Sequence, residues 1–485
     1  MLKKHLFSIF VIIALIYIVA DSVFSYKQFG DFCLDSDISN ISVPCKAYST
    51  ILENPLGLSI FTNHDRYAAT NRFFLHWSSY LYFNKMPLFL QSLGVNPISS
   101  VYMAFALLKL FSQLIYVLIL SLIVKQLTFL HKLHIPFIAV LFLCLFQTNG
   151  YDGQMGLIDK SISYFFSYGL PILVFLLYLY PYVYYFSNKK TLGNKWVNLF
   201  LLLILSYIIP FQGSLMCGII SVFLFTALIL IFTSQYKKNG KFSDILLYFK
   251  NLPIELTLPL IVIGIFSLYS FYLGTFNAEN DWVSLSITER YKRLPMGLFL
   301  ILTKRLGFPI LIIISLINSL YIIKNAPDET VERFKTVLKS LALFSLLYLL
   351  FLPLGGYRSY REYIIRFDTF IPVTICIFIF YVYSSVTSVQ IASAKVKIIF
   401  IAMLAISVAI FTIADCKREY QNSCEKTQLL VLSKTKSNAI NLRCDCTVFN
   451  WIAFSDYDRS KESAIMLYRW HVTDHVILYK TIADN

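Results

Sequence analysis

The sequence predicts an all-α polytopic membrane protein with about 11 transmembrane helices and a small extracytoplasmic C-terminal domain. Of its 485 residues, 57% are hydrophobic and only 14% are charged, and the apolar residues form continuous runs bounded by charge. Soluble domains carry about a quarter charged residues, so this composition excludes an ordinary soluble enzyme, a disordered protein and a collagen-like fibre. The apolar runs do not alternate with polar residues, which excludes a membrane β-barrel.

The predicted spans follow from the length of the apolar runs, since crossing a bilayer takes roughly 20 residues. The runs at 134–148 and 197–211 are slightly short and are either tilted hairpin arms or re-entrant segments. We expect the first span to be retained, because Ile18-Val19-Ala20 makes a poor signal-peptide cleavage site. The predicted spans are 6–25, 98–124, 134–148, 164–187, 197–211, 214–234, 252–275, 306–323, 337–354, 369–388 and 397–414.

Lys and Arg residues orient these spans, because they resist translocation across the membrane. With the N-terminus in the cytoplasm, the cytoplasmic segments carry 17 basic and four acidic residues, and the outer segments carry 24 and 21. The net charge of +15 therefore reports topology, and we expect no nucleic-acid partner. We expect a multi-pass protein of the plasma (inner) membrane whose C-terminus lies outside.

The predicted domains are a transmembrane domain at 1–414, with interfacial helices in its outer loop at 27–97, and an extracytoplasmic α/β or β-rich domain at 415–485. Six of the nine cysteines fall in outer segments, as an oxidising compartment favours. A Cys33–Cys45 disulfide and pairings within the tail are expected, although the sequence does not set their connectivity.

The first outer loop contains a dense cluster of polar and aromatic residues. From Arg66 to Leu90 its pattern predicts one or two amphipathic helices on the membrane surface. Asp65 is a candidate catalytic carboxylate, with Arg66 and Arg72 as anion donors beside it. The alternative is an interfacial aromatic anchor whose charges face water. Three earlier aspartates are rival carboxylates, although their setting around Cys33 and ahead of Cys45 is more typical of a solvated loop: Asp31, Asp35 and Asp37.

Charged residues also occur in the second outer loop and inside the second span. Asp152 and Asp159 are candidate catalytic residues, because no lipid-facing position would tolerate them, whereas the Gly residues at 150 and 153 are explained by turns. Lys109 lies midway along its span, where an unpaired charge costs a few kcal/mol. We expect it to face a carboxylate such as Asp21 or Asp152, as a structural ion pair or in catalysis.

Arginines and tyrosines alternate before the tenth span, on the face where topology does not call for positive charge. The planar guanidinium group matches phosphate oxygens two at a time, so this segment predicts a site for a lipid phosphate. The alternative is headgroup anchoring with local pairing to Glu362. The candidate arginines are Arg358, Arg361 and Arg366.

In layout and in these segments, the chain resembles the GT-C glycosyltransferases, membrane enzymes that use polyprenyl- or dolichyl-linked sugar donors. The stretch from Ile364 to Pro372 is similar to the Arg-aromatic run that enters a late helix in that superfamily. The resemblance implies a base, a second acid and a phosphate clamp: Asp65; Asp152 or Asp159; and Arg358, Arg361 and Arg366.

The resemblance implies transfer of a sugar from a polyprenyl-phosphate donor to a glycan, lipid or protein acceptor on the extracytoplasmic face. Arginines or a divalent cation (Mg²⁺ or Mn²⁺) would neutralise the leaving phosphate, and a carboxylate would act as general base. The metal requirement stays open. Two alternatives also remain: a polysaccharide polymerase or ligase, and a non-enzymatic transporter, flippase or assembly protein.

Overall fold

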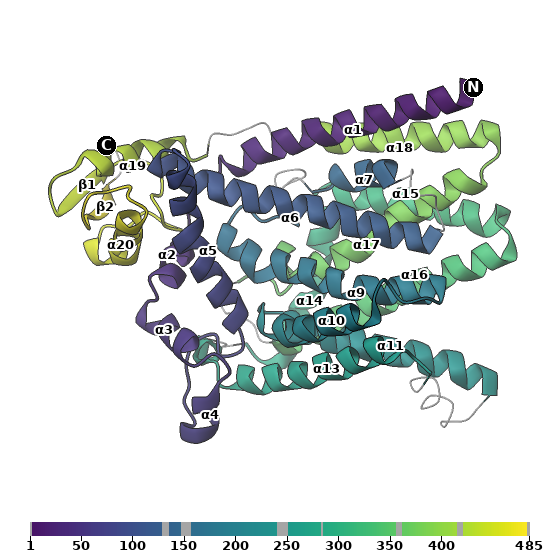
Figure 1. Cartoon of the computed structure of the whole chain (residues 1–485), viewed down its shortest axis with the longest axis horizontal. Coiled ribbons are helices and arrows are strands. Elements are labelled where there is room, and N and C mark those ends of the chain that lie inside the picture. Colours follow the sequence, from purple (N-terminus) through teal and green to yellow (C-terminus); the bar gives the residue numbers. More distant parts are fainter. Residues whose placement is uncertain are drawn as a thin grey trace.

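Long apolar helices lie side by side in a bundle that makes up most of the protein (Figure 1). The structure, a computed structural model, describes residues 2–128, 135–146, 157–239, 251–282, 285–355, 361–414 and 421–482. Within those ranges, nine helical segments are long and apolar enough to cross a membrane, as a multi-pass protein requires. These are α1 (Leu2–Phe29), α6 (Pro97–Thr128), α8 with η3 and α9 (Ile162–Asn188), α11 (Met216–Asn239), α13 (Ile254–Thr275), α15 (Gly307–Asn325), α16 with η6 (Asp328–Gly355), α17 (Phe367–Ile391) and α18 (Ala394–Ala414).

Two shorter apolar helices accompany these segments at the two positions where the sequence predicts short runs. Helix α7 (Ile135–Leu143) packs against α1, α6 and α17. Helix α10 (Lys195–Ile208) packs along α13 and continues into the 3-10 turn η4 (Ile209–Phe211). A helix of nine residues rises only about 14 Å, less than half of a bilayer core. Length alone therefore does not make α7 a full span.

Four helices of the segment 27–97, the predicted first outer loop, gather at one end of the bundle, the end opposite the N-terminus (Figure 1). They are α2 (Ser36–Ser42), α3 (Lys46–Glu53), α4 (Leu58–Asn63) and α5 (Phe73–Ser92). Helix α5 covers most of the segment for which the sequence predicts amphipathic helices. Phe83 and Leu90 on α5 are buried, whereas Trp77 is 46% exposed. The helix thus has one buried and one open face, but both faces carry large apolar side chains, so the predicted amphipathic pattern is weak in α5.

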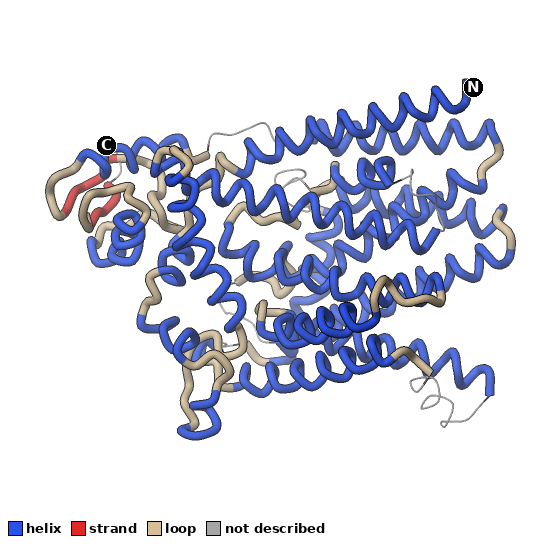
Figure 2. Tube along the Cα trace, in the orientation of Figure 1, coloured by secondary structure: helices blue, strands red, loops and turns tan. Residues whose placement is uncertain are grey.

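The C-terminal segments form a small α/β unit at the same end, and its two strands are the only ones in the described residues (Figure 2). Strands β1 and β2 pair in parallel across the 3-10 turn η7 and helix α20. The buried Trp470 holds this unit to α5, because its Nε1 donates to the Phe83 carbonyl over 2.7 Å. The elements are α19 (Ser423–Lys434), β1 (Ala439–Arg443), η7 (Tyr457–Ser460), α20 (Lys461–Arg469) and β2 (Leu478–Ile482).

A buried carboxylate joins this unit to the membrane domain. Glu425 on α19 accepts hydrogen bonds from the Leu34 and Phe449 backbone N–H groups, over 3.0 and 2.8 Å, and from the Tyr102 hydroxyl over 2.8 Å. Burial raises the pKa of Glu425 to about 7, against the effect of these donors. One side chain therefore links α19, the start of the first outer loop and α6.

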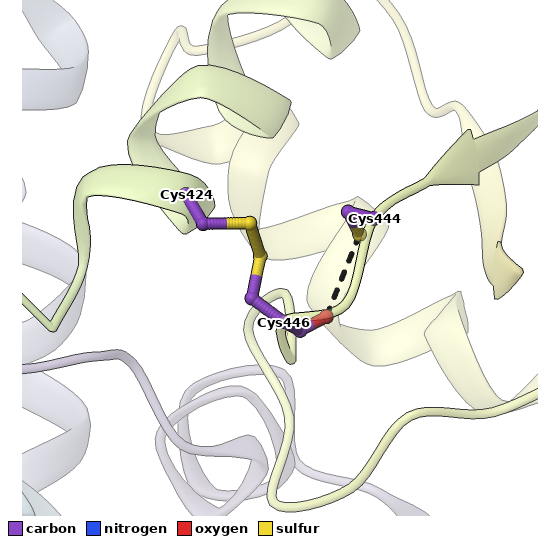
Figure 3. Close-up of side chains that lie close together, drawn as sticks. All are labelled: Cys424, Cys444 and Cys446. Carbon is purple, nitrogen blue, oxygen red and sulfur yellow. Dashed lines mark hydrogen bonds between the residues drawn. A yellow bond between two sulfur atoms is a disulfide. The ribbon is translucent and has the colours of Figure 1, made fainter. Parts of the chain in front are cut away.

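A disulfide joins Cys424 on α19 to Cys446, and the Cys444 thiol donates to the Cys446 carbonyl beside it (Figure 3). The expected pairing within the tail is therefore confirmed. The expected Cys33–Cys45 disulfide is wrong, since both side chains are free thiols. Helix α2 forms between them, and the Cys33 thiol points instead to the Gln421 carbonyl, 3.2 Å away.

Replacing Cys424 and Cys446 together by Ser should destabilise the C-terminal unit, because the bridge closes a loop with a sequence separation of 22. Chain-entropy arguments give about 3 kcal/mol for a loop of this size. Limited proteolysis of the purified protein should cut the C-terminal unit faster in the double variant. Cys45→Ser is the matched control and should leave the cleavage rate unchanged; faster cleavage in that control would instead implicate Cys45 in a bridge.

Candidate functional site

A cavity of about 240 Å³ lies at the end of the bundle that carries α2–α5. Its wall combines residues of the first outer loop, of α8 and η3, of the 3-10 turn η5 (Ala278–Trp282), and of the segment that leads into α17. These elements are far apart in the sequence and all lie outside or at the edge of the apolar helices. The charged residues of the wall are Asp37, Arg72, Glu279, Arg361 and Arg366.

The aspartate pair at the start of α2 fixes one side of the cavity. Asp35 caps this helix by accepting from the Asp37 N–H over 3.2 Å, which places Asp37 in the first turn and on the cavity wall. Asp35 itself is 3% exposed and accepts from the hydroxyls of Ser161 and Ser163, each over 2.7 Å. Burial raises its pKa, and these hydroxyls and the charge of Lys109 oppose that rise.

The sequence pattern indicates a solvated loop for these aspartates, and this is wrong for Asp35. Its buried side chain links α2 to α8. Ser161 caps α8 (Ile162–Tyr164) by accepting from the Tyr164 N–H over 3.1 Å. The π-helical turn η3 (Phe165–Gly169) follows at once, and such turns are frequent at functional sites. The link between α2 and α8 thus brings Asp37 and Ser163 onto one wall.

The segment before α17 supplies two arginines to the opposite side. Arg366 caps α17: its backbone N–H donates to Thr369 Oγ1 over 2.9 Å, and its guanidinium contacts Asp368 at 2.5 Å. Helix α14 (Ile287–Thr303) braces this segment, because Arg293 donates to the Glu362 carbonyl over 3.3 Å. The charges of Arg361, Arg366 and Asp37 all act on the Tyr164 hydroxyl. Asp37 and both arginines thus line one cavity and lie within electrostatic range of the same tyrosine.

A hydrogen-bonded ion pair forms the third part of the wall. Arg72 Nη1 lies 3.0 Å from Glu279 Oε2, and the Tyr48 hydroxyl donates to Glu279 Oε1 over 3.1 Å. Asn277 holds η5 in place, because its Oδ1 accepts from the Ala69 and Glu279 N–H groups, each over 3.0 Å. The first outer loop and η5 are therefore joined by side chains from both.

His76 lies behind this ion pair on α5 and also lines the cavity. Its ring is 4.9 Å from the Tyr48 ring and is 4% exposed. Burial lowers the pKa of His76 to about 3, with a further lowering from the charge of Arg72. The imidazole is therefore neutral at physiological pH and does not act as a cation.

The buried Lys109 and the half-buried Asp159 interact electrostatically, and neither lines the cavity. The Lys109 Nζ donates to the Lys160 carbonyl over 2.5 Å and lies 4.9 Å from the Phe32 ring centroid. Burial raises the pKa of Asp159 to about 6, while the charges of Lys109 and Arg366 lower it. Asp159 and Asp35 are thus the carboxylates that interact electrostatically with Lys109. Of the two partners expected for this lysine, Asp152 lies outside the described residues.

The structure brings together only some of the predicted site residues. Arg72, Arg361 and Arg366 line the cavity, and Asp159 is electrostatically coupled to Arg366. Asp65 is exposed and is not among the lining residues. Its neighbour Arg66 pairs with Asp281 over 2.7 Å at the surface, where both side chains are more than half exposed. Asp152 and Arg358 lie outside the described residues.

Asp37, a rival carboxylate that the sequence pattern assigns to a solvated loop, lines the cavity, and the pattern does not point to three further lining residues: Tyr48, His76 and Glu279. Asp37 has a local signal, since Asp35-Ser36-Asp37 has the composition of a helix N-terminus. Glu279 has none, because it is over 200 positions from Arg72 and only the fold joins the two.

Comparisons with known protein families, with curated proteins and with solved structures give no match to this chain. The chemistry of the cavity must therefore be argued from its own residues.

Asp159→Asn should flatten the pH dependence of stability. The folded protein keeps a proton on Asp159 up to about pH 6, whereas the unfolded chain releases it near the ordinary pKa of 3.8. The free energy of unfolding therefore falls as the pH rises through that window. Thermal melts in detergent between pH 4.5 and 7.5 should show a smaller fall in the variant. The exposed Asp458→Asn is the control, and an unchanged slope in Asp159→Asn would contradict the assignment.

Proposed function

We propose that the protein is an integral membrane glycosyltransferase that moves a sugar from a polyprenyl-phosphate donor to an acceptor hydroxyl on the extracytoplasmic face. The observation that carries the proposal is the cavity itself. It combines a carboxylate, Asp37, with the guanidinium groups of Arg361 and Arg366 at one end of the helical bundle. A membrane-embedded transferase needs this combination to activate an acceptor and release a phosphate near the lipid surface.

In this reaction the Asp37 side and the arginine side of the cavity have different roles. The Asp37 carboxylate takes the proton of the acceptor hydroxyl, and the acceptor oxygen attacks the anomeric carbon of the donor sugar. The bond from that carbon to the phosphate oxygen breaks, and the phosphate leaves with the electron pair. Arg361 neutralises the charge that develops on the leaving phosphate, as a guanidinium fork can with two oxygens at once. Arg366, whose charge Asp368 already compensates at 2.5 Å, contributes further N–H donors to the phosphate oxygens.

A divalent cation fits the described donor set poorly. Both oxygens of Glu279 are engaged, one by Tyr48 and one by Arg72, and Asp37 is the only other carboxylate that lines the cavity among the described residues. Mg²⁺ and Mn²⁺ favour several oxygen ligands. We therefore assign charge neutralisation to the arginines and derive no step through a metal.

The assignment of this end to the extracytoplasmic side rests on charge and on cysteine chemistry. The opposite end carries the N-terminus and Lys-rich connections such as 189–195 between α9 and α10. Basic connections favour the cytoplasm. The Cys424–Cys446 disulfide lies at the cavity end, which suits an oxidising compartment.

Asp37→Asn should abolish sugar transfer, by at least 100-fold, because the amide cannot accept the hydroxyl proton. Asp65→Asn should retain most of the activity, since Asp65 does not line the cavity. The assay measures surface glycan in cells that depend on the gene, with protein level checked by immunoblot. Loss in Asp65→Asn with full activity in Asp37→Asn would reverse the assignment, and unchanged glycan in both would favour a non-enzymatic role.

Arg361→Lys tests the phosphate clamp, because lysine keeps the charge but loses the two-pronged donor geometry. We expect at least a tenfold loss of transfer at unchanged protein level. Arg66→Lys is the matched control, because Arg66 pairs with Asp281 at the surface. Equal activity of the two variants would contradict a role of Arg361 in binding phosphate.

A further inference from the structure

We infer that the wall formed by Tyr48, Arg72, His76, Asn277 and Glu279 is a subsite for a neutral sugar ring of the acceptor. The inference rests on the proposed function for the reaction and deepens it by naming the charge class of the second substrate. It concerns the first-loop side of the cavity, whereas the phosphate belongs to the side of Arg361 and Arg366.

The first argument is charge. Arg72 and Glu279 compensate each other over 3.0 Å, and their side chains are only 20% and 8% exposed. A buried ion pair that is already complete gains little from a charged ligand and loses much when one partner is drawn away. His76 adds no charge, because its pKa is lowered to about 3. This wall is therefore polar but neutral.

The second argument is unused hydrogen-bonding capacity. Asn277 is 4% exposed, and its Oδ1 accepts hydrogen bonds from two backbone N–H groups. Its amide NH₂ has no hydrogen-bond partner among the described residues. The His76 Nδ1 has no partner there either, but it is enclosed by protein atoms, so the group that a ligand can reach is the Asn277 amide. Buried polar groups are normally satisfied. A ligand rich in hydroxyls, which both donate and accept, would satisfy such groups.

The third argument is shape and position. The Tyr48 and His76 rings lie 4.9 Å apart and tilted by 35°, so they offer an apolar surface beside the polar groups. Sugar rings present both kinds of surface, and small-molecule sites combine them. The charge of Asp37 acts on Tyr48 as well as on Tyr164. The proposed base is therefore within electrostatic range of Tyr48 on this wall and of Tyr164, and it lines the same cavity as the arginines, where an acceptor hydroxyl must meet the donor sugar.

Saturation-transfer NMR on the protein in lipid nanodiscs tests the subsite without turnover. The probes are methyl glycosides of common neutral hexoses and N-acetylhexosamines, methyl glucuronide and farnesyl phosphate. Tyr48→Phe removes one hydroxyl, and Glu279→Gln removes one charge; the exposed Glu53→Gln and the α5 variant Tyr80→Phe are matched controls. We expect at least one neutral glycoside to bind, with at least fivefold weaker affinity in Tyr48→Phe and Glu279→Gln and unchanged affinity in the controls.

Glu279→Gln should also gain affinity for methyl glucuronide, because it leaves the Arg72 charge uncompensated. Arg361→Gln should lower the affinity for farnesyl phosphate and leave the affinity for the neutral glycosides unchanged. Absence of binding by every neutral glycoside, or equal binding in wild type and Tyr48→Phe, overturns the subsite. Failure of farnesyl phosphate to bind, with normal glycoside binding, overturns the proposed transferase instead and leaves the sugar subsite standing.

Discussion

The buried carboxylate of Asp35 is the interaction on which the cavity depends. It caps α2 and accepts from two serine hydroxyls of another segment, so it joins the first outer loop to the start of α8. A carboxylate that is 3% exposed would be costly without such donors. The same contact sets the direction of α2 and therefore the place of Asp37 on the wall.

Pairing between distant segments places the remaining charges at this end of the bundle. Arg72 meets Glu279, Arg66 meets Asp281, and Glu425 meets the backbone of the first outer loop. Each contact joins the first outer loop to a segment more than 200 residues later. The C-terminal unit therefore connects the parts of this end. Through Glu425 it contacts α6, and through Trp470 it contacts α5.

The membrane architecture could be predicted from the sequence because hydropathy is a local property of each segment. Even the two short helices, α7 and α10, fall where the apolar runs are short. Arg361 and Arg366 could also be predicted as residues of a site, since arginines on the predicted outer face have no topological reason to be there. Glu279 could not be predicted, because only the fold brings it next to Arg72. Asp65 and Arg66 stood out for composition, yet they lie at an exposed loop, where water rather than the cavity surrounds them.

The central claim is that one cavity binds a lipid phosphate at the arginine side, within reach of Asp37. Photo-cross-linking with a diazirine-bearing polyprenyl phosphate, followed by peptide mass spectrometry, tests this most directly. The account predicts labels within the segments 361–369 and 163–168, which contribute lining residues to the cavity, and their loss when unmodified lipid phosphate is added in excess. Labels confined to the outward faces of α1 and α18, insensitive to that competitor, would contradict it.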